Sequence, residues 1–295
     1  NKISPFQSLA LTLAFTVMVV TSSFQVTSAH ADDSGTKYVE FSQIGDPAEV
    51  LEVKTEEPRP LEPGEIRVDV LASPIHPSNL LQISGNYGTA AALPSTPGSE
   101  GIGRVTEVSE GVSTISVDDL VLLTVGGTWR DEIAAPAAAF IPLPGLEIDD
   151  PKLIEQLSMT VINPLTAHLM LSSFVELNEG DWVVQSAANS AVGGYLVQLA
   201  KARGIKTVNV VRREGLAEDL MSKGATVVLI DGPDLADRIA AATEQQPVVL
   251  AIDAVGGDTF SRLATSLAKE GTLVTYGVMS GQPATFSPAL SIFND

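Results

Sequence analysis

The sequence predicts an α/β protein in which a β-rich first part precedes a doubly wound parallel sheet. From residue 181 on, short β-branched runs alternate regularly with helical patterns. Before about residue 150, strand-like runs are broken by proline and glycine and show no such alternation. We therefore expect three segments, namely a leader at 1–31, a β-rich domain at 32–158 and a parallel-sheet domain at 159–295.

The second part has the rhythm of consecutive strand–helix–strand units. Strands are expected near 182–187, 206–211, 226–231, 247–254 and 272–277, and helices near 192–203, 215–223, 233–243 and 257–269. Because crossover helices return the chain to parallel neighbours, this order favours a parallel sheet that is covered on both faces. The sequence stops at Asp295, where such a domain usually continues with another strand, so we expect a C-terminally truncated domain.

The β-rich part is predicted from shorter signals. Residues 66–70 alternate apolar and polar side chains, and 105–108 and 120–125 are further strand-like runs. The composition of Gly85-Asn86-Tyr87-Gly88 is typical of a turn. The pattern becomes helical near 150–178, which ends this part of the chain.

The first 31 residues have the order of a secretory signal peptide. They contain no acid and one base, Lys2, followed by a mostly apolar core at 9–20 and by Ala29-His30-Ala31. The core is short for a membrane span, which needs about 20 apolar residues. We therefore expect export to the periplasm and no membrane contact after cleavage. An organellar transit peptide is the alternative, because serine and threonine are frequent, although arginine is absent.

Composition excludes several classes of function. The formal net charge is −19, so the surface repels nucleic acid and anionic membranes. The chain has no cysteine, which rules out disulfides and thiolate metal sites. Of its three histidines only His76 and His168 lie beyond the expected leader, and two are too few for a histidine-based zinc site. We expect no metal, no nucleic acid and a small-molecule substrate.

The first crossover of the parallel part is built from small residues. The run 186–194 reads Ser-Ala-Ala-Asn-Ser-Ala-Val-Gly-Gly between a strand and a helix. A dinucleotide-binding unit needs small residues here, because side chains would keep the backbone from the pyrophosphate, and the helix N-terminus then faces the phosphates. The glycine pattern appears only as Ala188-x-Ser190-x-x-Gly193, so an ordinary crossover without a ligand is the alternative.

The end of the next strand points to the kind of dinucleotide. Arg212 and Arg213 stand where a carboxylate usually holds the ribose of NAD, and arginine suits the extra 2′-phosphate of NADP. The sequence therefore favours NADPH. Alternatively the two arginines form a solvated pair, and Glu214 neutralises one of them.

Several motifs in the same order along the chain carry a family resemblance. They are Pro77-Ser78-Asn79, Gly85-Asn86-Tyr87-Gly88, Gly98-Ser99-Glu100-Gly101, Gly127-Thr128-Trp129-Arg130, Asn163-Pro164-Leu165-Thr166-Ala167, the crossover at 187–193, Asn209-Val210-Val211-Arg212 and Val274-Thr275-Tyr276-Gly277. From about residue 38 to 295 the chain resembles the medium-chain dehydrogenase/reductase superfamily, and within it the mitochondrial-type 2-enoyl thioester reductases. The resemblance implies a GroES-like domain followed by a Rossmann domain, a homodimer at full length and no zinc.

The resemblance also implies a reaction. Hydride from NADPH would pass to the β-carbon of an enoyl thioester, and a proton would be delivered to the α-carbon. Tyr87 corresponds to the proton donor of that branch. A phenol, with an ordinary pKa of about 10, carries its proton at neutral pH. The alternative for Tyr87 is a packing tyrosine in a glycine turn.

The resemblance further implies which residues contact the cofactor. They are Asn163, Asn189, Ser190, Ala191, Val192, Gly193, Arg212, Arg213, Tyr276, Gly277, Val278 and Met279. Structural alternatives are a helix cap for Asn163 and a strand-end turn at Tyr276-Gly277. Two departures from the branch affect this site: Ala191 replaces a glycine, which would tighten the turn, and Glu214 follows where another arginine is usual. Ser99 stands where zinc-using relatives have histidine, and Glu100 has the alternative of a buried carboxylate bonded to backbone.

Two other functions remain open at this point. A quinone or enone reductase on the same scaffold needs no dedicated proton donor. An exported, non-catalytic nucleotide-binding protein would explain the leader-like front, because NADPH is not normally supplied outside the cytoplasm.

Overall fold

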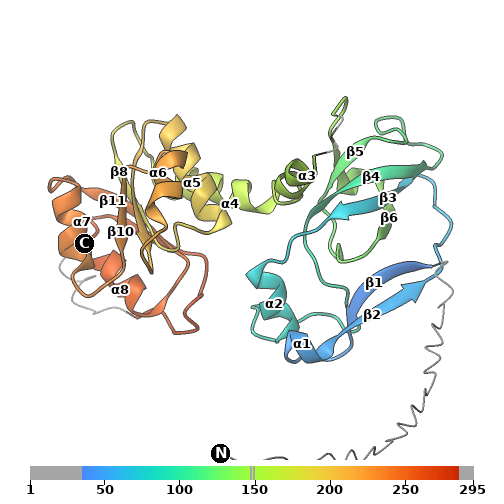
Figure 1. Cartoon of the computed structure of the whole chain (residues 1–295), viewed down its shortest axis with the longest axis horizontal. Coiled ribbons are helices and arrows are strands. Elements are labelled where there is room, and N and C mark those ends of the chain that lie inside the picture. The colour runs from blue at the N-terminus through green and yellow to red at the C-terminus, as the bar shows by residue number, and fades with distance from the viewer. Residues whose placement is uncertain (1–34, 147, 149, 286–295) are drawn as a thin grey trace, which may run out of the picture. The chain divides into compact units, whose positions relative to one another are not determined.

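The computed structural model describes residues 35–146, 148 and 150–285, and both the expected leader and the end of the chain at 286–295 lie outside this range. The β-rich part begins with an antiparallel hairpin and then forms a five-stranded antiparallel sheet in the order β6-β3-β4-β5-β7 (Figure 1). Its elements are β1 (Thr36–Phe41), α1 (Pro47–Val50), β2 (Leu51–Glu56), β3 (Glu65–Ala72), α2 (Pro77–Ile83), β4 (Gly101–Val108), β5 (Leu120–Leu123), β6 (Glu132–Pro136), a 3₁₀ turn (Ala137–Ala139) and β7 (Phe140–Pro142).

The alternation expected at 66–70 has its physical basis in strand β3, which lies between β4 and β6. Ile66 and Val68 are fully buried and pack with Val105, Val121 and Ile133 from the neighbouring strands. Each buried aliphatic side chain contributes about 1.5–3 kcal/mol to folding. Between and after them, Arg67 is half-buried and Asp69 is exposed, so β3 has one apolar face and one more polar face.

The second part is a five-stranded sheet in which all pairs are parallel, in the order β10-β9-β8-β11-β12. Its elements are α4 (Ile162–Ser172), β8 (Trp182–Gln185), α5 (Ala191–Ala202), β9 (Lys206–Val211), α6 (Ala217–Lys223), β10 (Val227–Ile230), α7 (Leu235–Ala242), β11 (Val248–Asp253), α8 (Gly257–Thr265) and β12 (Thr272–Thr275). The five strands and four crossover helices expected from the sequence are confirmed.

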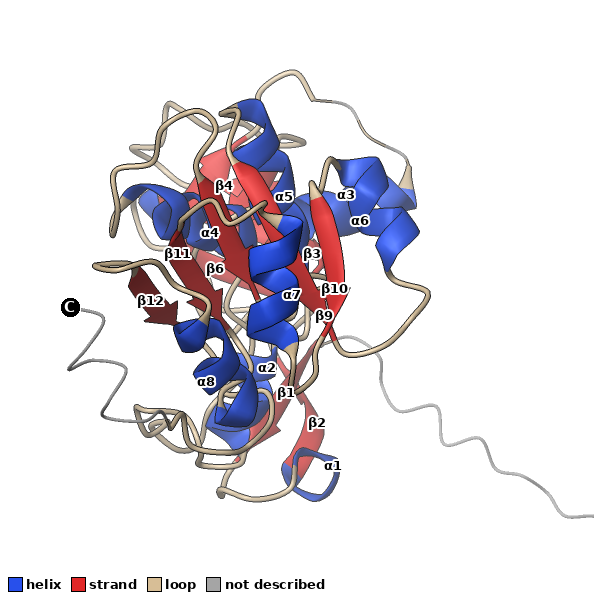
Figure 2. Cartoon of the chain, turned by 90° about the vertical axis from the view of Figure 1, so that its left-hand side faces the viewer, coloured by secondary structure: helices blue, strands red, loops and turns tan. Residues whose placement is uncertain are grey.

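Alternate residues of the central strands enter two separate cores. Val183 packs with Leu196 of α5 and Leu171 of α4 on one face of the sheet. Val184 packs with Leu235 of α7 and Leu263 of α8 on the opposite face (Figure 2). The sheet is therefore doubly wound, as the sequence predicts.

Helix α3 (Pro151–Ser158) leads from the β-rich part into α4. Asp150 caps it by accepting from the N–H of Lys152, with Pro151 at the first helical position. No helix in the described range has the length and hydropathy that crossing a membrane requires.

Candidate functional site

The order of the parallel sheet reverses between β8 and β11, and in doubly wound sheets such a reversal leaves a crevice outside the carboxyl ends of the two strands. The chain runs outward from β8 through β9 to β10 and then returns to form β11 on the other side of β8. Ligands of doubly wound sheets bind at the carboxyl ends of the strands where the order reverses in this way. Here the two strand ends are joined by Ser186 Oγ, which donates to Oδ1 of the fully buried Asp253 at 2.7 Å.

The turn after β8 is shaped for close approach of a ligand to the backbone. Ser190 is the N-cap of α5, and its hydroxyl accepts from the N–H of Gly193 at 3.1 Å. A Cβ on Gly193 would lie 2.7 Å from the carbonyl carbon of Ala188 and 2.8 Å from its Cα, so only glycine fits. Ala187 has a positive φ of 47°. Because the helix begins directly after this turn, its free N–H groups face the crevice.

Ala191, which stands where a glycine was expected, is the first helical residue of α5 and is exposed. Asn189 is also exposed, whereas Val192 is half-buried and packs on the core below.

The segment that follows β12 closes against the same crevice. The N–H of Tyr276 donates to the carbonyl of Asp253, and that of Met279 to Ala254. A Cβ on Gly277 would lie 2.8 Å from the Ala254 carbonyl oxygen, so this segment passes closer than a side chain allows. Burial raises the pKa of Tyr276, opposed by a hydrogen bond of its hydroxyl with Ser190. Val278 and Met279 are 45% and 62% exposed, apolar side chains without cover.

Arg212 and Arg213 follow β9 at the same carboxyl edge of the sheet. Both are exposed, and neither forms an ion pair with any residue that the structure describes. Glu214 forms no ion pair with either of them within the described residues, whereas their exposure agrees equally with the alternative of a solvated pair. Two uncompensated guanidinium groups are thus available to an anion.

Asn163 lies inside the first turn of α4 and does not cap it. The N-cap position belongs to Val161, which makes no side-chain cap, so the cap alternative for Asn163 is wrong. Asn163 is 5% exposed, and its Nδ2 has no hydrogen-bond partner. A buried amide donor without an acceptor costs about 1–3 kcal/mol, which a bound oxygen would relieve.

Glu100 is a buried carboxylate bonded to backbone, which is the alternative considered from the sequence, but the particular groups that bind it were not predicted. It is fully buried, and its Oε2 accepts from the backbone N–H groups of Val161 and Ile162 at 2.9 and 2.8 Å. Its Oε1 lies 2.7 Å from Nε2 of His76, the N-cap residue of α2. Since a carboxylate only accepts, the histidine hydrogen is on Nε2. A chemistry-bearing residue directly before Pro77 is the signal that could have singled out His76.

Tyr87 lies in a turn directly after α2. The N–H groups of Asn86 and Tyr87 both donate to the carbonyl of Leu81, at 2.8 and 3.1 Å, and Gly85 has a positive φ of 75°. Tyr87 is 48% exposed, so it is not buried in a core, and its role as proton donor stays a prediction.

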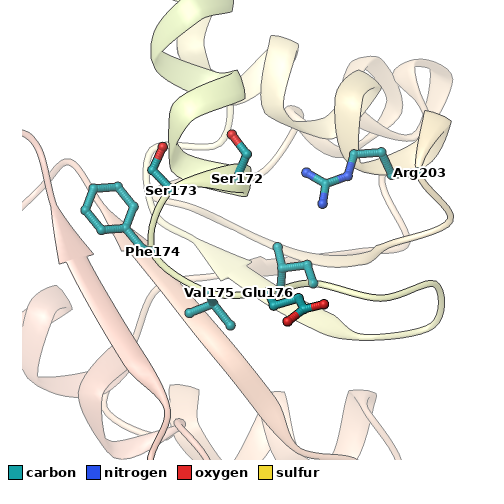
Figure 3. Close-up of a pocket in the computed structure, with 7 residues that line it drawn as sticks. Ser172, Ser173, Phe174, Val175, Glu176 and Arg203 are labelled. Atoms are coloured by element: carbon teal, nitrogen blue, oxygen red, sulfur yellow. The ribbon is translucent and has the colours of Figure 1, made fainter.

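Two hollows lie elsewhere. One of about 350 Å³ at the C-terminal end of α4 is lined by Ser172, Ser173, Phe174, Val175, Glu176, Leu177 and Arg203 (Figure 3). Asn163 stands at the other end of that helix, so this hollow is separate from the crevice. The second, of about 550 Å³, lies along β1 and β3 and includes Trp129 and Arg130. Neither contains a predicted site residue.

The residues at the carboxyl edge fit a nicotinamide dinucleotide phosphate. The close approaches at Gly193 and Gly277 leave space that a side chain would fill, Asn163 offers an unsatisfied donor, and two arginines lack counter-charges. Across the described ranges, no group of three or more histidine, aspartate or glutamate side chains is placed to hold a metal ion.

Comparison with known proteins identifies the family of this arrangement. Residues 62–145 match the alcohol dehydrogenase GroES-like domain, and residues 191–295 match the domain described as zinc-binding dehydrogenase. The mitochondrial enoyl-acyl-carrier-protein reductase of Rattus norvegicus is 36% identical over 282 residues, which cover 93% of this chain and 74% of the relative. That of Homo sapiens is 36% identical over 275 residues, 91% of this chain and 72% of the relative.

Solved structures of similar fold include reductases of the same superfamily. A mitochondrial 2-enoyl thioester reductase heterodimer from Candida tropicalis superposes with a TM-score of 0.79 at 33% identity, covering 88% of this chain and 80% of that one. A complex of its Etr1p subunit with NADP and crotonyl-CoA gives 0.79 at 32% identity, covering 88% and 79%. A quinone reductase from Bacillus thuringiensis gives 0.77 at 31% identity, covering 85% and 75%. The chain therefore belongs to the medium-chain dehydrogenase/reductase superfamily, with the mitochondrial 2-enoyl thioester reductases among its relatives.

Proposed function

We propose that the protein is an NADPH-dependent oxidoreductase that reduces the conjugated C=C bond of 2-enoyl thioesters. The observation that carries the proposal is that a relative of 36% identity over 93% of the chain is an enoyl reductase. The exposure of Tyr87 in its glycine turn agrees with it. When bound, NADPH supplies the hydride that reaches the β-carbon of the substrate. The protein has to hold the two reactants and deliver one proton.

The residues divide this work. Arg212 and Arg213 hold the 2′-phosphate, and the start of α5 with Ser190 faces the pyrophosphate. Asn163 gives its free Nδ2 hydrogen to an oxygen of the cofactor. The Tyr87 hydroxyl donates its proton to the α-carbon as negative charge develops on the thioester. Asn189, Ala191, Val192, Gly193 and the segment Tyr276, Gly277, Val278 and Met279 complete the surface against the cofactor.

Oxidation of NADPH measured against a panel of substrates tests the proposal. The panel contains crotonyl-CoA, an enal of similar size and a quinone, each assayed with NADPH and with NADH. We expect turnover of crotonyl-CoA with NADPH to exceed that of the quinone. Turnover of the quinone alone, or no turnover with any acceptor, contradicts the proposal.

A quinone reductase is the second candidate, because a structure of that name superposes with a TM-score of 0.77. It transfers hydride to an acceptor that needs no positioned proton donor. Y87F separates the two candidates, since the variant loses activity on the thioester and keeps its activity on quinones only if Tyr87 is the donor.

The relatives also bear on location and assembly. The curated relatives at 36% identity are mitochondrial, which supports the organellar alternative over export. We therefore propose an organellar enzyme, and no finding supports a secretory signal. A homodimer is proposed because a related 2-enoyl thioester reductase forms a two-chain assembly, the Etr1p/Etr2p heterodimer. Fractionation and light scattering test these two points.

A further inference from the structure

The carboxylate of Glu100 touches both segments that carry the proposed reaction. Its Oε2 receives two N–H groups from the first turn of α4, which contains Asn163. Its Oε1 faces His76, where α2 begins, and α2 ends just before the turn of Tyr87. One buried side chain thus joins the start of the helix of Asn163 to the start of the helix before Tyr87.

At the start of α4, the carboxylate of Glu100 takes the place of a missing N-cap side chain. We call its link between the starts of α4 and α2 the bridge. Val161 at the N-cap of α4 offers no side-chain acceptor, so the first N–H groups need one from elsewhere. Glu100, 61 and 62 residues away in the chain, satisfies two of them and places a negative charge at the positive end of the helix. The first turn of α4, and with it Asn163, is thereby fixed in direction.

The α2 end is reinforced by neighbours of Glu100. Asn79 in the first turn of α2 donates from Nδ2 to the hydroxyl of Ser99 at 2.7 Å, and its Oδ1 accepts from the N–H of His76 at 3.0 Å. The backbone carbonyl of Glu100 accepts from the hydroxyls of Ser73 and Thr128. Both ends of the residue are held, so it has no freedom to follow either helix alone.

We propose that Glu100 is a positioning residue that sets Asn163 and Tyr87 in register for the reduction. The proposal rests on the function proposed above. It requires the length of the side chain and a hydrogen-bonding group at each of its two terminal atoms, because one atom bonds to α4 and the other to His76. Neither substrate nor cofactor touches Glu100, which is fully buried.

Two substitutions of Glu100 distinguish the contribution of its side-chain length from that of its charge. E100D keeps the carboxylate but is one methylene too short to reach both helices. E100Q keeps the length and removes the charge. Its amide oxygen can accept from the N–H groups of α4, and its amide nitrogen can donate to Nε2 of His76 in the other tautomer. E65D is the matched control, because Glu65 is a buried carboxylate with several donors that lies in β3, outside the proposed site.

The readouts are the Kd for NADPH from fluorescence titration, the Tm and the kcat with crotonyl-CoA. We expect E100D to raise the Kd about three- to tenfold, as for loss of one hydrogen bond, and to lower kcat. E100Q stays near the wild type, and E65D lowers only the Tm. In an N163A background E100D adds no further loss of NADPH affinity, since both changes remove the same contact.

The proposal is overturned if E100D leaves the Kd for NADPH unchanged. It is also overturned if the losses of NADPH affinity from E100D and N163A multiply in the double variant. If E100D does not fold, the H76A variant tests the proposal. We expect its kcat to fall and its Kd for NADPH to stay unchanged, because Oε2 of Glu100 still binds the start of α4. A change in both kcat and Kd, or in neither of them, contradicts the proposed bridge. A wild-type protein that binds no NADPH at all refutes the proposed function instead, so the two failures are distinct.

Discussion

The network around Glu100 and the predicted cofactor-binding residues Asn163, Arg212 and Arg213 differ in how far their polar groups are satisfied within the protein. Around Glu100 the carboxylate meets three donors, and its carbonyl meets two hydroxyls. By contrast, the buried amide Nδ2 of Asn163 lacks a partner, and the exposed Arg212 and Arg213 lack counter-charges among the described residues. A saturated network holds geometry, whereas unsatisfied groups provide binding energy for a ligand. The difference distinguishes residues that position from residues that bind.

Tyr87 gives the largest expected effect. It belongs to neither group, because the residue is exposed and its hydroxyl has no partner among the described residues. Replacing it by phenylalanine removes the proton donor and keeps the ring, so kcat on crotonyl-CoA should fall by about 10²–10⁴-fold with the Kd for NADPH unchanged. Y38F is the control, since Tyr38 lies in β1 under the guanidinium of Arg130. Equal kcat values for Y87F and the wild type contradict the role.

The two adjacent glycines of α5, Gly193 and Gly194, should respond differently to substitution by alanine. A Cβ at Gly193 meets the backbone of Ala188, so G193A should cost about 1–3 kcal/mol of stability and weaken NADPH binding more than tenfold. A Cβ at Gly194 meets only the end of Lys223 at 3.7 Å, so G194A should stabilise the helix by about 0.5–1 kcal/mol. Urea unfolding and NADPH titration measure both. Equal effects of the two substitutions would argue against a close approach at Gly193.

The smallest expected effect is on stability and concerns Glu65. Its carboxylate is hydrogen-bonded within the protein and lies outside the proposed site. Arg59 contacts both oxygens of Glu65 at 2.7 and 2.8 Å, and this lowers the pKa of Glu65 to about 2 from an ordinary 4.5. A lowered folded-state pKa means that the stabilisation is complete above pH 4.5 and is lost as pH falls towards 2.

The stability difference between the wild type and E65Q should therefore be present at pH 7 and shrink between pH 4.5 and 2. Thermal unfolding at several pH values measures it, and NADPH affinity should not change. E57Q removes an exposed carboxylate without an ion pair among the described residues and serves as the control. A difference that grows on acidification would contradict the pairing.

Much of the fold could be predicted from the sequence because its signals are local. The apolar periods at 206–211 and 247–254 correspond to strands β9 and β11. Strand β7 was not predicted, because three residues, Phe140–Pro142, are too few to show a period. Strand β6 (Glu132–Pro136) alternates, but its small alanines give weak contrast between the two faces.

The site could be predicted only in part, for a physical reason. Small residues at 186–193 and the arginines after β9 are adjacent in sequence to the strands that place them. The bonds of Glu100 to Val161 and Ile162 span more than sixty residues, and no local pattern indicates them. That Asn163 has an unpaired amide depends on what surrounds it in three dimensions.

The affinities of NADPH and NADH for the wild type and for R212A/R213A test the central claim most directly. Each charged hydrogen bond to the 2′-phosphate contributes about 1.5–3 kcal/mol, so NADPH affinity should fall about tenfold or more per arginine. NADH lacks this phosphate, and its affinity should stay unchanged. A wild type that binds NADH as tightly as NADPH, or a double variant that keeps its NADPH affinity, contradicts the account.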